Sequence, residues 1–121
     1  MSRTACQRLT DILERIAGAT TAESRLTAAE TEHDDELVQI AFDAVLYDLL
    51  VIGEAIKSLP NEWKDDHPAV PWSDAAGMRD ILAHQYFRIR SDVVRSTLDA
   101  PLAALRLACE AIIEVRCSPN S

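Results

Sequence analysis

The segment that most limits the fold runs from Glu36 to Ser58, because it joins a long apolar stretch to a defined end at Pro60. Its few polar side chains fall close to one line of a helix, and they are Gln39, Asp43, Tyr47 and Glu54. So wide an apolar surface needs more cover than three neighbouring helices provide. We therefore expect this helix to lie in or near a contact with a second copy of the chain.

Apolar periodicity indicates further helices on both sides of this segment. A first amphipathic helix carries Leu9, Ile12, Leu13 and Ile16 and is expected to stop near Gly18. The small, polar and acidic segment 20–35 is interpreted as a loop. Segment 60–71 contains Pro68 and Pro71, so it is predicted not to be helical throughout.

Ser73 is the predicted cap of a third helix, which should turn Met78, Ile81 and Leu82 inward. A fourth helix is expected from Ser91 or Asp92. The run 99–101 predicts a cap and a restart, followed by an apolar stripe to about residue 115. The chain is thus predicted to be all-α, an up-and-down bundle of four or five helices formed by residues 1–121 as one domain.

Composition agrees with a helical domain that does not cross a membrane. Of its 121 residues, 48% are hydrophobic and 26% are charged, with only 3 Gly and 5 Pro. Asp43, Asp48 and Glu54 interrupt the most hydrophobic stretch, and the N-terminus lacks an apolar signal core. We therefore expect a cytoplasmic protein.

Cysteine and histidine spacing excludes several kinds of site. Cys6, Cys109 and Cys117 are odd in number and lack paired spacing, so neither a disulfide nor a zinc site is expected. The three histidines lie far apart, and there is no Gly-rich phosphate loop. An enzyme built from this chain would have to work without a metal or another cofactor.

The charge of the chain is −8 and is unevenly distributed. Six acidic residues lie between Glu23 and Glu36 against Arg25 alone, whereas segment 79–95 carries four arginines and two aspartates. A negative protein is a poor partner for nucleic acid, but a local basic patch could hold a short stretch of RNA. Alternatively, these arginines form a solvated face with carboxylate partners.

Within that basic segment, Arg79, His84 and Tyr86 form an Arg-x4-His-x-Tyr pattern. A permanent cation, an imidazole that titrates near neutrality and a phenol would together suit chemistry on a phosphate ester. On one helix Arg79 and His84 point about 140° apart, so the helix unwinds, the arginine reaches around, or a second copy completes the site. Asp80 lies four residues before His84 and could orient its ring. The alternative is that all of these residues have ordinary structural roles, since short patterns arise by chance.

Four separated motifs carry a resemblance to a known family. They are Val51-Ile52-Gly53-Glu54-Ala55-Ile56, Leu59-Pro60, Val70-Pro71-Trp72, and Gly77-Met78-Arg79-Asp80-Ile81-Leu82-Ala83-His84-Gln85-Tyr86. In this order they resemble the HepT-like branch of the HEPN superfamily, over residues 9 to about 107.

The resemblance implies a helical dimer that acts as a metal-independent endoribonuclease toxin. Arg79 would hold the scissile phosphate, and His84 would act as general base or acid around attack by the 2′-OH. Asp80 stands where the family often has Asn. The implied partner is a nucleotidyltransferase antitoxin that transfers AMP to Tyr86.

Two further residues are candidates for the cleft, Glu54 and Arg88. For Glu54, a salt bridge to an arginine is the simpler interpretation. The rival to the ribonuclease hypothesis is a helical accessory subunit that binds the nucleotidyltransferase without catalysis. The charge of −8 favours this rival, and the intact Arg79, His84 and Tyr86 favour the ribonuclease.

Overall fold

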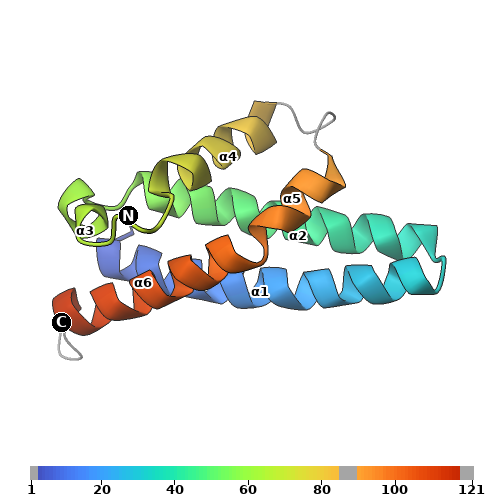
Figure 1. Cartoon of the computed structure of the whole chain (residues 1–121), viewed down its shortest axis with the longest axis horizontal. Coiled ribbons are helices and arrows are strands. Elements are labelled where there is room, and N and C mark those ends of the chain that lie inside the picture. The colour runs from blue at the N-terminus through green and yellow to red at the C-terminus, as the bar shows by residue number, and fades with distance from the viewer. Residues whose placement is uncertain (1–2, 85–89, 118–121) are drawn as a thin grey trace.

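A computed structural model describes residues 3–84 and 90–117 of the chain. Six helices make up these ranges: α1 (Ala5–Thr31), α2 (Asp35–Lys57), α3 (Asn61–Asp65), α4 (Trp72–His84), α5 (Ser91–Thr97) and α6 (Ala100–Arg116) (Figure 1). The described residues contain no strand, so the predicted all-α class is confirmed. Five of these six helices fall on segments that were expected to contain helices, where four or five were predicted, and the sixth, α3, is one short turn inside the expected 60–71 connection.

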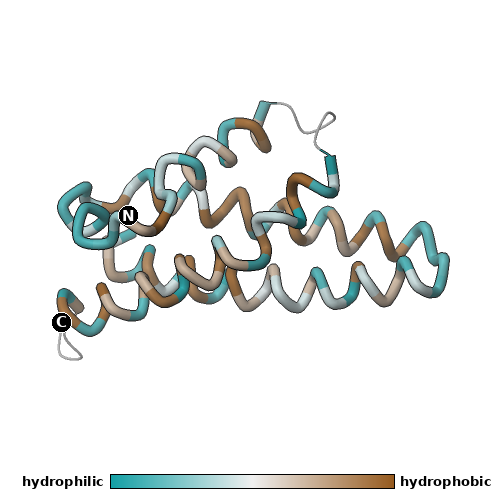
Figure 2. The backbone as a smooth tube through the Cα atoms, in the orientation of Figure 1, coloured by the Kyte–Doolittle hydropathy of each residue, from teal (hydrophilic) through white to brown (hydrophobic). Residues whose placement is uncertain are grey.

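A long antiparallel hairpin of α1 and α2 forms the body of the bundle (Figure 1). Both helices have side-chain caps: Thr4 accepts a hydrogen bond from the Gln7 backbone N–H at 3.0 Å, and Asp34 accepts one from that of Leu37 at 3.1 Å. The hairpin turns at His33, whose φ of 57° is left-handed. Figure 2 shows that this turn is hydrophilic, as a solvated connection should be.

The prediction that the first helix stops near Gly18 and that segment 20–35 is a loop is wrong. Helix α1 continues to Thr31, and its second half buries four residues at helical spacing, Ala19, Ala22, Leu26 and Ala29. Three of the four are alanines, which give a weak hydrophobic signal but allow two helices to pack closely. The acidic residues of the segment lie on the faces that remain.

Gly18 has a packing role in the middle of α1. A Cβ atom there would come within 2.9 Å of the Asp48 Oδ2 atom on α2. Asp48 is buried, and its Oδ1 atom accepts a hydrogen bond from Arg15 Nη1 at 3.2 Å. The Arg15 guanidinium also lies over the ring of Tyr47, 5.4 Å from the ring centroid. The glycine therefore makes room for a partly buried ion pair between the two helices.

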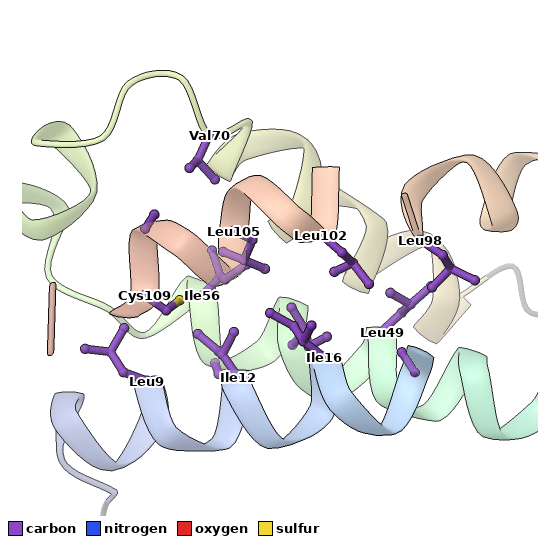
Figure 3. Packing of buried hydrophobic residues seen from close by; sticks show 14 of the residues in the cluster. Leu9, Ile12, Ile16, Leu49, Ile56, Val70, Leu98, Leu102, Leu105 and Cys109 are labelled. Atoms are coloured by element: carbon purple, nitrogen blue, oxygen red, sulfur yellow. The ribbon is translucent and has the colours of Figure 1, made fainter. Parts of the chain in front are cut away.

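Helix α4 packs on α2, and α6 packs on α1, which encloses one hydrophobic core (Figure 3). Its most deeply buried large side chains include Leu9, Ile12, Ile56 and Cys109. Full burial of a large aliphatic side chain contributes about 1.5–3 kcal/mol. The predicted stripe on α6 lies in this core, with Leu102, Leu105, Cys109 and Ile112 buried.

Two details of α4 differ from the sequence prediction. The helix begins at Trp72, before the predicted cap Ser73, and its first turn closes with a bond from the Ala75 N–H to the Pro71 carbonyl. Leu82 is buried as expected, but Ile81 is 45% exposed because it faces away from α2.

The expectation that no disulfide forms is also wrong, since Cys6 and Cys117 are bonded. The two residues are 111 positions apart, and their Cα atoms lie 6.0 Å apart at adjoining ends of α1 and α6. Sequence spacing could not reveal this pair because helix packing, not local sequence, brings the two ends together. Cys109 remains a free thiol in the core, and burial raises its pKa to about 12.

Over the ranges that the structure describes, none of the helices has the combination of length and apolar character needed to cross a bilayer.

Candidate functional site

The candidate site lies where α4 crosses α2, at a point of very close approach. A Cβ atom on Gly53 would lie 2.5 Å from the Arg79 Cβ atom and 3.0 Å from the Ala75 carbonyl oxygen. Only glycine fits at this position without a shift of one helix. The contact sets Arg79 of α4 beside Glu54 of α2.

Arg79 is held by two carboxylates. Its Nε atom donates a hydrogen bond to Glu54 Oε2 at 2.5 Å, and Nη1 donates one to Asp80 Oδ1 at 3.2 Å. Bonds to Glu54 and then to Asp80 raise the pKa of the guanidinium, so it is always charged. The predicted salt bridge between Glu54 and an arginine is therefore confirmed.

Asp80 accepts hydrogen bonds from Lys57 as well as from Arg79. Lys57 Nζ donates a hydrogen bond to Asp80 Oδ1 at 3.1 Å. Bonds from Lys57 and then from Arg79 lower the pKa of the Asp80 carboxyl. Glu54, Arg79, Asp80 and Lys57 thus form one chain of alternating charge across α2 and α4, which we call the Arg79 network.

The Arg79 network borders an open pocket of about 350 Å³. Helix α2 contributes Val51 and Glu54, α4 contributes Arg79 and Ala83, and the start of α1 contributes Arg8 and Asp11. The motif arginine is therefore accessible to a ligand from solvent.

His84 is the last residue of α4 and is exposed. It follows Ala83 of the pocket wall, and on a regular helix it points about 140° away from Arg79. Among the described residues, the Asp80 carboxylate bonds to Lys57 and Arg79 rather than to His84. The expected Asp80 contact to the imidazole is not made within this chain, and the catalytic roles remain predictions.

Two predicted site residues, Tyr86 and Arg88, lie outside the described residues. Of the other arginines in the basic segment, Arg90 pairs with Asp92 and Arg95 pairs with Glu30. The described part of this segment thus matches the alternative of a face with carboxylate partners.

Two residues of the site were missed from the sequence, Lys57 and Arg8. Lys57 lies on the predicted α2 helix, but only the α2–α4 crossing shows that it reaches Asp80. Arg8 comes from the first turns of α1, and no local pattern connects it to the motif. Across the described residues, no three His, Cys, Asp or Glu side chains are grouped so that they could hold a metal ion.

A helical bundle with an accessible arginine and a histidine five residues later on one helix is what the resemblance to HEPN proteins implied. The family model described as "Ribonuclease HepT-like" matches residues 4–112. The chain belongs to this family, and the predicted HepT-like branch is confirmed.

Similar proteins carry related names. A protein of Caldanaerobacter subterraneus, provisionally named as an RNase, is 37% identical over 71 residues, which are 59% of this chain and 63% of that protein. "Probable ribonuclease HepT" of Thermococcus cleftensis is 41% identical over 63 residues, 52% of this chain and 57% of that protein. A protein of Methanocaldococcus jannaschii, also provisionally named as an RNase, is 38% identical over 71 residues, 59% and 61% of the two chains.

In each case the match spans less than two thirds of the relative's length. No solved structure matches this chain.

Proposed function

We propose that this protein is a metal-independent endoribonuclease that cleaves RNA by attack of a 2′-OH on the adjacent phosphate. The observation that carries the proposal is Arg79, held in place by Glu54 and Asp80 at the edge of an open pocket. His84 follows on the same helix. Family membership and the names of the relatives support the same activity.

Arg79 can bind a phosphate without leaving its partners. A guanidinium has five N–H donors, and the bonds to Glu54 and Asp80 use two of them. The remaining three can face a phosphate and stabilise the negative charge that develops on it. The two carboxylates fix the orientation of the side chain before RNA binds, which favours catalysis.

In the proposed reaction, the 2′-oxygen forms a bond to phosphorus, and the bond from phosphorus to the 5′-oxygen breaks. A base takes the 2′-OH proton and an acid protonates the 5′-oxygen, which leaves a 2′,3′-cyclic phosphate and a 5′-OH. An imidazole suits either role because its ordinary pKa is near neutrality. His84 fills one of the two roles.

The proposed active form is a dimer with a cleft made by both copies. Leu37, Ile40 and Tyr47 of α2 are 47%, 57% and 55% exposed. They recur at spacings of three and seven residues, and the same face of α2 continues to Val51 and Glu54 at the pocket. A row of exposed aliphatic and aromatic side chains that leads to the site, although Asp43 lies beside it, supports a contact between copies there. A second copy would also relieve the separation of Arg79 and His84 on one helix.

The proposed biological role is that of a toxin, controlled by a nucleotidyltransferase antitoxin that transfers AMP to Tyr86. Tyr86 is two residues after His84. A bulky anion at that position would block the cleft and repel RNA phosphate. This part of the proposal rests on the motif and on family membership.

A non-catalytic subunit of the nucleotidyltransferase is the second candidate function. The observation that favours it is the pair of carboxylates on Arg79, since they offset its charge toward an anionic substrate. The overall charge of −8 acts in the same direction.

Incubation of the purified protein with RNA in excess chelator separates the two candidates. The ribonuclease cleaves, and an Arg79→Ala protein prepared in the same way does not. An Arg106→Ala protein, which loses an exposed arginine paired with Glu110 on α6, serves as the matched control and should cleave normally. If the wild type leaves RNA intact but binds the nucleotidyltransferase, the accessory role is correct.

A further inference from the structure

Arg8 differs from most arginines of this protein in having no counter-ion. Seven others are ion-paired: Arg3, Arg15, Arg79, Arg90, Arg95, Arg106 and Arg116. Within the described ranges, Arg8 and Arg25 are the two arginines that form no ion pair. Within these ranges, neither of these two guanidinium groups is held by any of the 20 acidic residues of the protein, so each is available to an external anion.

Arg8 differs from Arg25 in its position. Arg8 lies in the first turns of α1 and lines the same pocket as Arg79 of α4, so helices far apart in sequence bring two arginines to one pocket. Arg25 lies further along α1 and is not part of this pocket. Both arginines therefore lie on α1 without an ion pair, but only Arg8 lines the pocket.

The charges around the pocket leave Arg8 in surplus. Asp11 on its wall is already held by Arg3, through bonds of 2.6 Å and 3.1 Å. Glu54 is held by Arg79, and Asp80 beside it is held by Lys57 and Arg79. The ionised groups that line the pocket are Arg8, Asp11, Glu54 and Arg79, and the ion-pair networks that they join add Arg3, Asp80 and Lys57, which gives three carboxylates and four bases in all. Together these networks carry one net positive charge on a protein of charge −8.

We propose that Arg8 is a second phosphate-binding residue of this site, which holds an RNA phosphate neighbouring the one at Arg79. The inference rests on the proposed ribonuclease function and deepens it. A phosphate that approaches Arg8 competes with no carboxylate, and the guanidinium can bind it through two parallel hydrogen bonds. Arg8 thus contributes to binding of the substrate backbone, while Arg79 acts at the scissile phosphate.

The test compares Arg8→Gln with Arg25→Gln, which remove the same charge from the same helix. Arg8→Gln should raise KM for a short single-stranded RNA by about tenfold, as expected for a lost charged hydrogen bond, and leave kcat nearly unchanged. RNA binding is measured in proteins that also carry His84→Ala, so that the RNA stays intact. There, Arg8→Gln should make RNA binding less dependent on salt and reduce the slope of log K against log salt by about 0.7. Arg25→Gln should match the wild type in both measurements, and Arg8→Lys should recover the salt slope.

Three results would overturn the inference. If Arg8→Gln and Arg25→Gln change KM equally, only general charge is involved. If Arg8→Gln lowers the mass by light scattering, Arg8 belongs to a contact between copies. Either of these two results would leave the proposed ribonuclease function unaffected. If the wild type neither binds nor cleaves RNA, the proposed function fails together with this inference.

Discussion

Arg79 is the central residue of the proposed site, because it joins three charged neighbours, Glu54, Asp80 and Lys57, at the edge of an open pocket. Its partners Glu54 and Asp80 hold it in one orientation, and Lys57 holds Asp80 in turn. A positively charged group with a fixed direction is what stabilisation of a charged transition state requires.

Loss of either motif residue should abolish RNA cleavage without unfolding the protein. Arg79→Ala removes the phosphate contact, and His84→Ala removes the proton transfer. Neither side chain is part of the core, so circular dichroism and the melting temperature should stay close to those of the wild type. A folded His84→Ala protein with full activity would exclude the proposed acid–base role.

The pKa of Asp80 offers a test of the Arg79 network. Because the folded-state pKa is lowered, the charged carboxylate contributes to stability above its unfolded pKa of about 4, and that contribution is lost as the pH falls through the folded pKa. Lys57→Gln removes the largest cause, so the Asp80 pKa should rise toward its ordinary value in a carboxyl NMR titration. A Lys64→Gln variant is the control, since Lys64 bonds to the Ile56 carbonyl instead. An unchanged Asp80 pKa in Lys57→Gln would show that the network is not formed in solution.

Part of the site could be predicted from the sequence. The Arg-x4-His pattern pointed to Arg79, Asp80 and His84, and a salt bridge to an arginine was the simpler interpretation of Glu54. The Lys57–Asp80 pair and the position of Arg8 could not be predicted, because both depend on how α4 and α1 pack on α2.

At the scale of elements, the crossing of α2 and α4 decides where Arg79 lies. Two glycines near this crossing differ in the space around the position of a Cβ atom. Gly53 on α2 faces the Arg79 Cβ atom and the Ala75 carbonyl, whereas a Cβ atom on Gly77 of α4 would meet nothing within 4 Å.

Substitution by alanine should therefore have opposite effects on stability at the two glycines. Gly53→Ala gains up to about 1 kcal/mol of helix propensity, but crowding against a neighbouring helix costs about 1–3 kcal/mol. It should therefore destabilise the protein or displace α4, and RNA cleavage should fall. Gly77→Ala should stabilise the protein by about 0.5–1 kcal/mol and keep activity. Chemical denaturation of both proteins gives the comparison, and equal stability and activity would contradict the close crossing.

Helices with large apolar residues were predictable, and those with small residues were not. Helix α2 was placed within one residue at each end because its apolar run is long and its end is marked by Pro60. The second half of α1 was missed because Ala19, Ala22 and Ala29 are buried but give little hydrophobic signal.

At the scale of the whole molecule, the Cys6–Cys117 bond ties the first helix to the last. Closing a loop of this length stabilises a fold by up to about 4–5 kcal/mol in the chain-entropy model. The cytoplasmic location remains a prediction, and in that compartment thiols are kept reduced. The sequence could not reveal the pair, since it depends on the final packing of α1 and α6.

The proposed dimer predicts which exposed apolar residue matters. Ile40 on α2 and Leu107 on α6 are 57% and 59% exposed. They are almost equally exposed, but only Ile40 lies on the proposed contact surface of α2. Ile40→Glu should shift the mass measured by light scattering from dimer to monomer at micromolar concentration, because it places a charge in the row of exposed side chains on α2. Leu107→Glu should leave the mass unchanged. A wild type that is monomeric and active would refute the shared cleft.

The chemical ends of the RNA fragments distinguish metal-independent attack by the 2′-OH from other routes of RNA cleavage. RNA is incubated in excess EDTA with the wild type and with the Arg79→Ala and His84→Ala proteins, and the fragments are weighed by mass spectrometry. We expect 2′,3′-cyclic phosphate and 5′-OH ends from the wild type and no cleavage by either variant. Fragments with 3′-OH and 5′-phosphate ends, cleavage that requires Mg²⁺, or equal cleavage by the variants would contradict the proposed mechanism.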